Sequence, residues 1–181
     1  AIGRLVEAEG VFSVPIPYNP DELRWRPDLG GGALGDLGCY PLHALRSVTG
    51  EEPEIISASA VMSHGVDETL SAELQFPGGT RGRLSCSMSG TGFAANLTLR
   101  GETGSIEILN FVAPQLGCRF TLERNGVREV LTVDPRATYA WQFDHVADVL
   151  AGRASPITGG VDAIANMTAI DAIKRAAAAA E

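Results

Sequence analysis

The spacing of apolar residues changes twice along the chain, from a helical period to a strand period and back. Residues 4–14 carry β-branched and aromatic residues and predict a first strand. Four prolines and three glycines within residues 15–33 predict a long irregular loop. A helix is predicted over 35–49, ending before Gly50. Its apolar positions are Leu34, Leu37, Leu42, Leu45 and Val48.

The period then becomes two, which is typical of strands with one buried face. In residues 67–76, apolar side chains alternate with Thr, Ser, Glu and Gln. The dipeptide Asn125-Gly126 predicts a two-residue hairpin, because both turn positions require a positive φ. Seven strands are predicted in succession, at 54–63, 67–76, 80–89, 93–101, 104–110, 118–124 and 127–133.

Two further helices are predicted at 138–152 and 160–180. Their apolar stripes consist of Tyr139, Phe143, Val146, Ala147 and Leu150 in the first, and Val161, Ile164, Met167, Ile170 and Ile173 in the second. Strands segregated from helices predict the α+β class, with one large, mostly antiparallel or mixed sheet and helices on one face. We expect helices 35–49, 139–152 and 160–179 to cover that face, within a single domain over 1–181.

Composition narrows the function classes. A net charge of −8 argues against a nucleic-acid partner. No apolar run approaches the ~18 residues of a membrane span, and no signal peptide is visible. Three scattered cysteines favour a reducing cytoplasm over a disulfide framework. The chain starts without methionine, so we expect it to be part of a longer protein, and its arginine and alanine bias suggests a bacterial source.

The densest chemistry lies in residues 30–43, GGGALGDLGCYPLH. On a helix Asp36, Tyr40 and His43 would share one face. Pro41 suits only a first helical turn, so the helix could also begin near Tyr40, with Asp36 in the turn before it. The residues allow two interpretations, either a capping aspartate beside two buried aromatic residues or a polar site at a helix N-terminus. The glycines predict a close approach of backbone to a ligand or to a neighbouring domain.

Other motifs are weaker. The three histidines lack metal-ligand spacing, so no metal site is predicted. No G-x-S-x-G motif supports a serine hydrolase. The cluster Arg24-Trp25-Arg26 directly precedes the glycines, and it is either a solvated loop or a contact for an anion or a ring.

Three segments together resemble a known family: RWRPDLGGGALGDLGCYPLHALRSVTG, GVDETLSAELQFPGGT and RGETGSIEI. They resemble the C-terminal domain of the glucose–fructose oxidoreductase / inositol dehydrogenase / MocA family, in its sugar and dihydrodiol dehydrogenase branch. The resemblance covers nearly the whole chain. It implies a two-domain enzyme whose N-terminal Rossmann domain binds NAD or NADP and carries a catalytic lysine. That domain is not found in residues 1–181, so we expect this chain alone to be inactive.

The resemblance also implies roles for individual residues. Asp36 matches the family aspartate that orients substrate hydroxyls, and Tyr40 stands where many relatives have a proton-transferring histidine. Trp25 and Arg26 match residues that contact the nicotinamide half of the cofactor. The remaining candidates are substrate-binding: Tyr139, which matches an active-site tyrosine of some members, and His43, which shares the predicted helix face.

The implied reaction is hydride transfer between a nicotinamide cofactor and a secondary alcohol of a sugar, polyol or dihydrodiol. A non-catalytic binding or dimerisation module that keeps the fold is the alternative. Short polar side chains on the second sheet face predict a homodimer or higher homo-oligomer, which the resemblance also implies, against the alternative of a hydrated monomeric sheet. This face comprises Thr69, Ser71, Glu73, Arg81, Arg83, Ser85, Ser87, Asn96 and Thr98.

Overall fold

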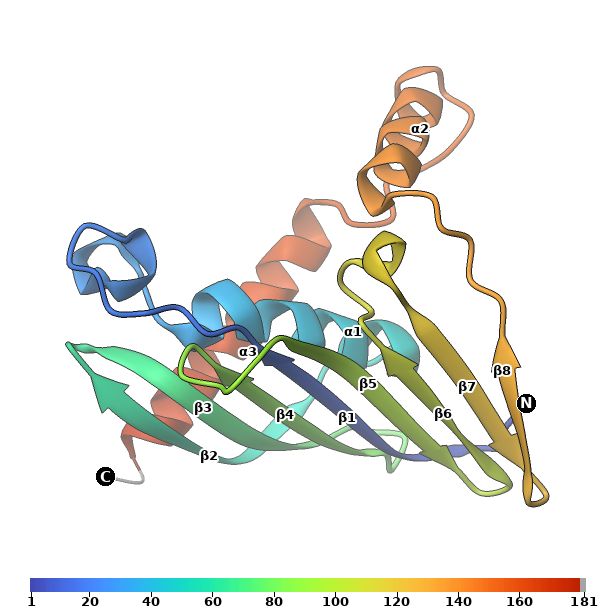
Figure 1. Ribbon diagram of the computed structural model, residues 1–181, viewed down its shortest axis with the longest axis horizontal. Helices are drawn as coiled ribbons and strands as arrows, with labels where there is room; N and C mark the ends of the chain where they lie inside the picture. Colours follow the sequence, from blue (N-terminus) through green and yellow to red (C-terminus); the bar gives the residue numbers. More distant parts are fainter. Residues whose placement is uncertain (180–181) are drawn as a thin grey trace.

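A single sheet dominates the computed structural model, which describes residues 1–179 (Figure 1). Its strands run in the order β2-β3-β4-β1-β5-β6-β7-β8. All neighbouring pairs are antiparallel except β1 and β4, which are parallel. The predicted large, mostly antiparallel sheet is therefore confirmed. The strands are β1 (Leu5–Ser13), β2 (Glu54–Ser63), β3 (Val66–Gln75), β4 (Arg81–Ser87), β5 (Ala94–Gly101), β6 (Gly104–Leu109), β7 (Arg119–Arg124) and β8 (Val127–Leu131).

The first strand of the chain lies in the middle of the sheet. β1 pairs with β4 on one side and β5 on the other, so the connection between those two strands passes its end. The predicted hairpin between β7 and β8 is confirmed, because Asn125 and Gly126 have φ of 53° and 74°. A positive φ at both positions matches the right-handed twist of the flanking strands.

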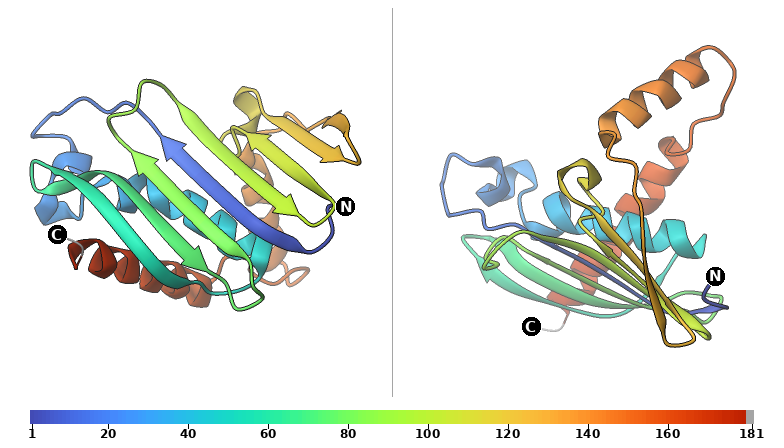
Figure 2. Two further views of the ribbon diagram at one scale, coloured as in Figure 1. Left: turned by 90° about the horizontal axis from the view of Figure 1, so that it is seen from below. Right: turned by 45° about the vertical axis from the view of Figure 1, so that its right-hand side comes forward.

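Two helices cover one face of the sheet, and together they close the core. Helix α1 (Cys39–Thr49) lies along the central strands β1 and β4, and α3 (Gly160–Ala178) lies against β2 near the sheet edge (Figure 2). The predicted last helix reached residue 180, which lies outside the described residues. The buried side chains come from alternate strand positions and from the helices: Leu70, Leu74, Leu84, Cys86, Met88, Leu97, Leu42, Leu45, Ile170 and Ile173.

Helix α2 (Thr138–Leu150) does not cover the sheet, so the prediction that residues 139–152 do so is wrong. The helix projects away from the body beyond β8 (Figures 1 and 2). All five residues of β8 are exposed. This edge of the sheet therefore offers α2 no buried apolar surface to pack against. The stripe on α2 and the first half of α3 is exposed at Tyr139, Phe143, Val146, Leu150, Val161, Ile164 and Met167.

Candidate functional site

The predicted helix at 35–49 has two parts. Leu34–Gly38 forms a π-helical turn, and α1 continues from Cys39. Pro41 is the third residue of α1, and the backbone before it is already helical, because Gly38 and Cys39 have right-handed helical dihedral angles. Asp36 lies in the π turn just before α1, and its side chain caps neither segment. The interpretation of Asp36 as a helix cap is thus not supported.

A buried carboxylate holds the start of the π turn. Asp67, at the beginning of β3, is 8% exposed, and its Oδ2 accepts the backbone N–H of Leu34 at 2.6 Å. Gly32 has a φ of 121°, and a Cβ there would collide with the Asp67 carboxylate. Only glycine lets the backbone pass this carboxylate. Burial raises the pKa of the Asp67 carboxyl above its usual value.

The Asp36 side chain is held by an arginine from the preceding loop. Arg24 Nε donates to Asp36 Oδ2 at 2.6 Å, and Arg24 Nη1 donates to Glu22 Oε1 at 2.8 Å. All three side chains are about one-third exposed. The hydrogen bond to Asp36 is the main reason that the pKa of Arg24 lies above its usual value. A charged cluster of two carboxylates and one guanidinium therefore lies beside the helix start.

Tyr40 lies next to this cluster, at the mouth of a hollow of about 340 Å³. Its ring packs edge-on against Phe12 of β1, with centroids 5.4 Å apart, and the residue stays 48% exposed. Burial is the largest cause that raises the pKa of the Tyr40 phenol, whereas the Arg24 charge lowers it. The hollow is lined by Phe12, Val14, Ile16, Arg24, Asp36, Leu37 and Tyr40.

His43 lies one turn further along α1 and faces a second hollow of about 530 Å³, which Tyr40 also lines. His43 Nε2 is 3.1 Å from Asp162 Oδ2 in α3. The same carboxylate accepts Arg46 Nη1 at 3.0 Å, and Arg46 also pairs with Glu52. His43 thus belongs to an ionic network that joins α1 to α3. Its predicted substrate contact stays a prediction.

Tyr139, at the start of α2, is one of the groups that raise the pKa of the Tyr40 phenol. Tyr139 is otherwise largely exposed. Its predicted substrate contact is untested. Asp36, Tyr40 and His43 line the two hollows that share Tyr40, whereas Tyr139 lines neither of them.

Neither of the two residues expected to contact cofactor lines a hollow with Tyr40. Trp25 is buried, with edge-on contacts to Tyr18 and His64, which stack on each other with centroids 3.6 Å apart. Its Nε1 has no hydrogen-bond partner in the described part of the chain. Arg26 pairs with the neighbouring Asp28 and is exposed. Of the cluster Arg24-Trp25-Arg26, Arg24 alone contacts Asp36.

Sequence reasoning missed two residues of this site. Arg24 was grouped with its neighbours but not assigned to Asp36, and Asp67 was not singled out within the predicted strand at 67–76. In the alternation of β3, Asp67 shares the parity of the polar positions Thr69 and Ser71, so the local pattern does not mark it as buried. No group of three or more His, Cys, Asp or Glu suited to a metal occurs within residues 1–179. None of the helices described is long and apolar enough to cross a membrane.

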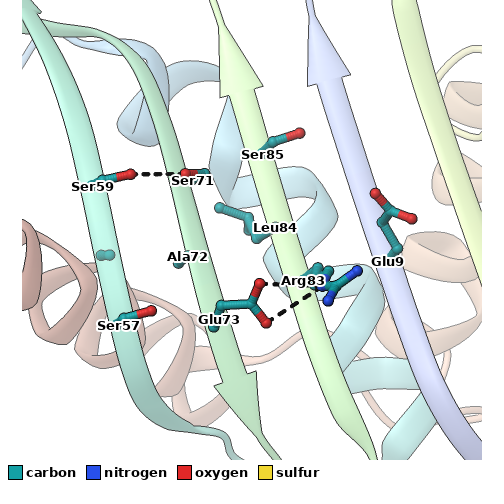
Figure 3. A pocket seen from close by; sticks show the side chains of 10 residues that line it. Glu9, Ser57, Ser59, Ser71, Ala72, Glu73, Arg83, Leu84 and Ser85 are labelled. Carbon is teal, nitrogen blue, oxygen red and sulfur yellow. Dashed lines mark hydrogen bonds and ion pairs between the residues drawn. The ribbon is translucent and has the colours of Figure 1, made fainter.

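The open face of the sheet carries a separate shallow hollow of about 310 Å³ (Figure 3). Short serines from β2, β3 and β4 line it, and Ser59 Oγ lies 3.0 Å from Ser71 Oγ. Arg83 Nε donates to Glu73 Oε1 at 3.2 Å, next to Glu9 of β1. None of the nine residues predicted for this face is buried.

The family comparison matches residues 1–107 to the GFO/IDH/MocA C-terminal domain. Among curated relatives, D-xylose 1-dehydrogenase (NADP(+)) 2 of Haloferax volcanii is 26% identical over 97% of this chain and 55% of its own length. Trans-1,2-dihydrobenzene-1,2-diol dehydrogenase of Mus musculus is 35% identical over 62% of this chain and 34% of its own.

Among solved structures, the aldose-aldose oxidoreductase from Caulobacter crescentus, complexed with glycerol, superimposes with a TM-score of 0.89 at 27% identity. The match covers 99% of this chain and 55% of that protein. The chain thus spans about half the length of the oxidoreductases that it matches along nearly its whole extent.

Proposed function

Because the chain belongs to the GFO/IDH/MocA family as its C-terminal domain, we propose that it forms the substrate side of an NAD(P)-dependent oxidoreductase. The relatives' names include a xylose dehydrogenase, a dihydrodiol dehydrogenase and an aldose-aldose oxidoreductase. The reaction we propose is hydride transfer between the nicotinamide and a secondary alcohol of a sugar, polyol or dihydrodiol. The observation that carries this proposal is the hollow in which Asp36 and Tyr40 lie together beside Arg24.

The chain's residues have distinct roles in this reaction. The nicotinamide cofactor supplies or accepts the hydride. Tyr40, half exposed at the mouth of the hollow, exchanges the proton of the alcohol oxygen. Asp36 accepts hydrogen bonds from neighbouring substrate hydroxyls through the carboxylate oxygen that Arg24 leaves free. The Phe12 ring gives the apolar side of the hollow, which suits the C–H face of a sugar or a dihydrodiol ring.

These residues fit one ring of substrate or cofactor and not a whole dinucleotide. The hollow measures about 340 Å³, and the glycines at 31 and 32 pack against the chain's own Arg24 and Asp67 rather than forming an open phosphate loop. We therefore propose that a nucleotide-binding domain holds the remainder of NAD or NADP. Trp25 and Arg26 remain our candidates for contacts with the cofactor from this side.

We propose that this second domain packs on α2 and the start of α3. Large apolar side chains are exposed there, including Phe143 at 73% and Leu150 at 83%. Several large apolar side chains exposed on one pair of helices are typical of an interface. The surface adjoins the site, because Met167 lines the same hollow as Tyr40. A domain seated there would bring the cofactor to Tyr40.

The test is kinetic, in the enzyme that contains this chain together with its nucleotide-binding domain. Tyr40→Phe and Asp36→Ala should each lower kcat by about 10²–10⁴-fold, the contribution of a general acid–base group, with little change in unfolding temperature. The chain alone should show no turnover with any sugar and NAD(P). Unchanged kcat in both variants would favour the alternative, a non-catalytic binding module.

We also propose that the open sheet face forms a homodimer. Short serines allow a second sheet to approach closely, and Arg83 and Glu73 can exchange partners across a two-fold axis. The interface should bury at least ~1,200 Å² in total. Sedimentation at micromolar concentration should give a dimer, which Arg83→Glu dissociates. A monomer in the wild type would contradict the proposal.

A further inference from the structure

The backbone and the side chain of Arg24 both form hydrogen bonds with the segment that begins the helix. Its carbonyl oxygen accepts the N–H of Gly32 at 2.9 Å. A Cβ on Gly31 would come within 2.6 Å of the same oxygen, so only glycine permits this contact. The backbone of Arg24 and the π turn that carries Asp36 are therefore fixed relative to each other.

The side chain of Arg24 faces two carboxylates from opposite sides. Nε donates to Asp36 Oδ2 at 2.6 Å and Nη1 donates to Glu22 Oε1 at 2.8 Å. Because a guanidinium is planar and rigid, two such bonds fix its orientation. The contact to Asp36 engages one carboxylate oxygen, and Asp36 Oδ1 has no hydrogen bond to any described residue. Asp36 Oδ1 is thus available for a hydrogen bond at the hollow that Asp36 lines.

We propose that Arg24 is the positioning residue of this site, acting on proton transfer through Asp36 and Tyr40 rather than by touching the reacting atoms. The inference rests on the proposed oxidoreductase function. It assigns Arg24 two tasks: to aim the Asp36 carboxylate, and to supply the positive charge that stabilises a Tyr40 phenolate.

The charge balance around Tyr40 supports the second task. Burial, Cys39, Tyr139 and Asp36 all raise the pKa of the Tyr40 phenol, in that order of size. Arg24 is the group that lowers it. His43 also lines a hollow with Tyr40, but its ring nitrogen faces the Asp162 carboxylate. Removing the Arg24 charge should therefore raise the pKa of Tyr40 further, because Arg24 is the charge that lowers it.

The first experiment needs no cofactor. Tyrosine phenolate absorbance is titrated in this chain and in Arg24→Gln, with Tyr40→Phe in each background to isolate the signal of Tyr40. The Tyr40 transition should move to higher pH in Arg24→Gln and move less in Arg24→Lys, which keeps the charge. Arg4→Gln, which removes the exposed ion pair with Glu102, is the matched control and should leave it unchanged. An unmoved transition in a folded Arg24→Gln chain would overturn the inference.

The second experiment uses the enzyme with its nucleotide-binding domain. General acid–base groups contribute about 10²–10⁴-fold, so a residue that acts through them should cost about tenfold or more in kcat when changed to Gln. The rate of alcohol oxidation requires the phenolate, so its rise with pH should move to higher pH in Arg24→Gln. A loss of kcat without that movement would mean a structural role only. An inactive wild type would count against the proposed function, while the titration would still decide the role of Arg24.

Discussion

Helices α1 and α2 have similar apolar stripes, but the stripe of α1 is buried and the stripe of α2 is exposed to solvent. In α1, Leu42 and Leu45 are fully buried against the central strands, whereas in α2 Phe143 is 73% exposed. The pattern that predicts an amphipathic helix is present in both. The comparison shows that such a pattern identifies the side of a helix that needs cover, while the topology decides which element provides it.

The difference arises from the segments that precede each helix. α1 follows a π turn that Asp67 fixes to the sheet, so its stripe is placed directly over β1 and β4. α2 follows the edge strand β8 and a short link, and it packs extensively against no other described element. Arg136 in that link lies 4.5 Å from the Trp141 ring and pairs with Asp144. Neither contact covers the apolar stripe, which is the surface on which we propose that a second domain packs.

The largest expected effect is on the α1 side. Leu45→Ala should lower the free energy of unfolding by about 2–5 kcal/mol, because it leaves a cavity in a fully packed core. Val48→Ala in the same helix is the control, since Val48 is exposed and the change should stay within about 0.5 kcal/mol. Urea unfolding of this chain measures both. Equal losses of unfolding free energy in Leu45→Ala and Val48→Ala would contradict the burial of the α1 stripe.

A smaller effect is expected at the contact that places α1. Asp67→Ala removes the acceptor for the Leu34 N–H and should cost about 1–3 kcal/mol. Asp67→Asn keeps an acceptor of the same shape and should cost less. Unfolding in urea at pH 7 compares the two variants, and an equal loss in both would contradict the role of the hydrogen bond.

The pH dependence of unfolding in the same variants tests the direction in which burial shifts the pKa of Asp67. Burial raises the pKa of the Asp67 carboxyl in the fold above its usual 3.8. The protonated carboxyl therefore stabilises the fold, and this stabilisation is lost as pH rises through the raised pKa. Wild type should lose stability relative to Asp67→Asn from about pH 4 upward. A difference that does not change with pH would contradict this assignment.

The smallest effect is expected on α2. In this chain Phe143→Ala should change the free energy of unfolding by no more than about 0.5 kcal/mol, because the side chain already lies in water. If α2 packs against a nucleotide-binding domain as we propose, the same change in the two-domain enzyme should weaken that contact and lower the unfolding temperature. If Phe143→Ala destabilises this chain as much as Leu45→Ala does, α2 is covered within the chain or by a second copy.

The sequence by itself determined the strands, the hairpin at Asn125-Gly126 and the α+β class. These features depend on periodicity and turn chemistry, which are carried by residues close together in the chain. It also brought Asp36, Tyr40 and His43 to one part of the molecule, since three to seven residues separate neighbours on a helix face.

Only the tertiary structure decided what those residues contact. Arg24 is 12 residues from Asp36, Asp67 is 33 residues from Leu34, and Asp162 is 119 residues from His43. Such pairs depend on the order of the strands and on which helix reaches the sheet, and no local pattern encodes either. The same holds for α2, whose apolar stripe is not covered by any other described part of the chain. Local spacing fixes the shape of an element, whereas its partners are chosen by the free energy of the whole packed arrangement.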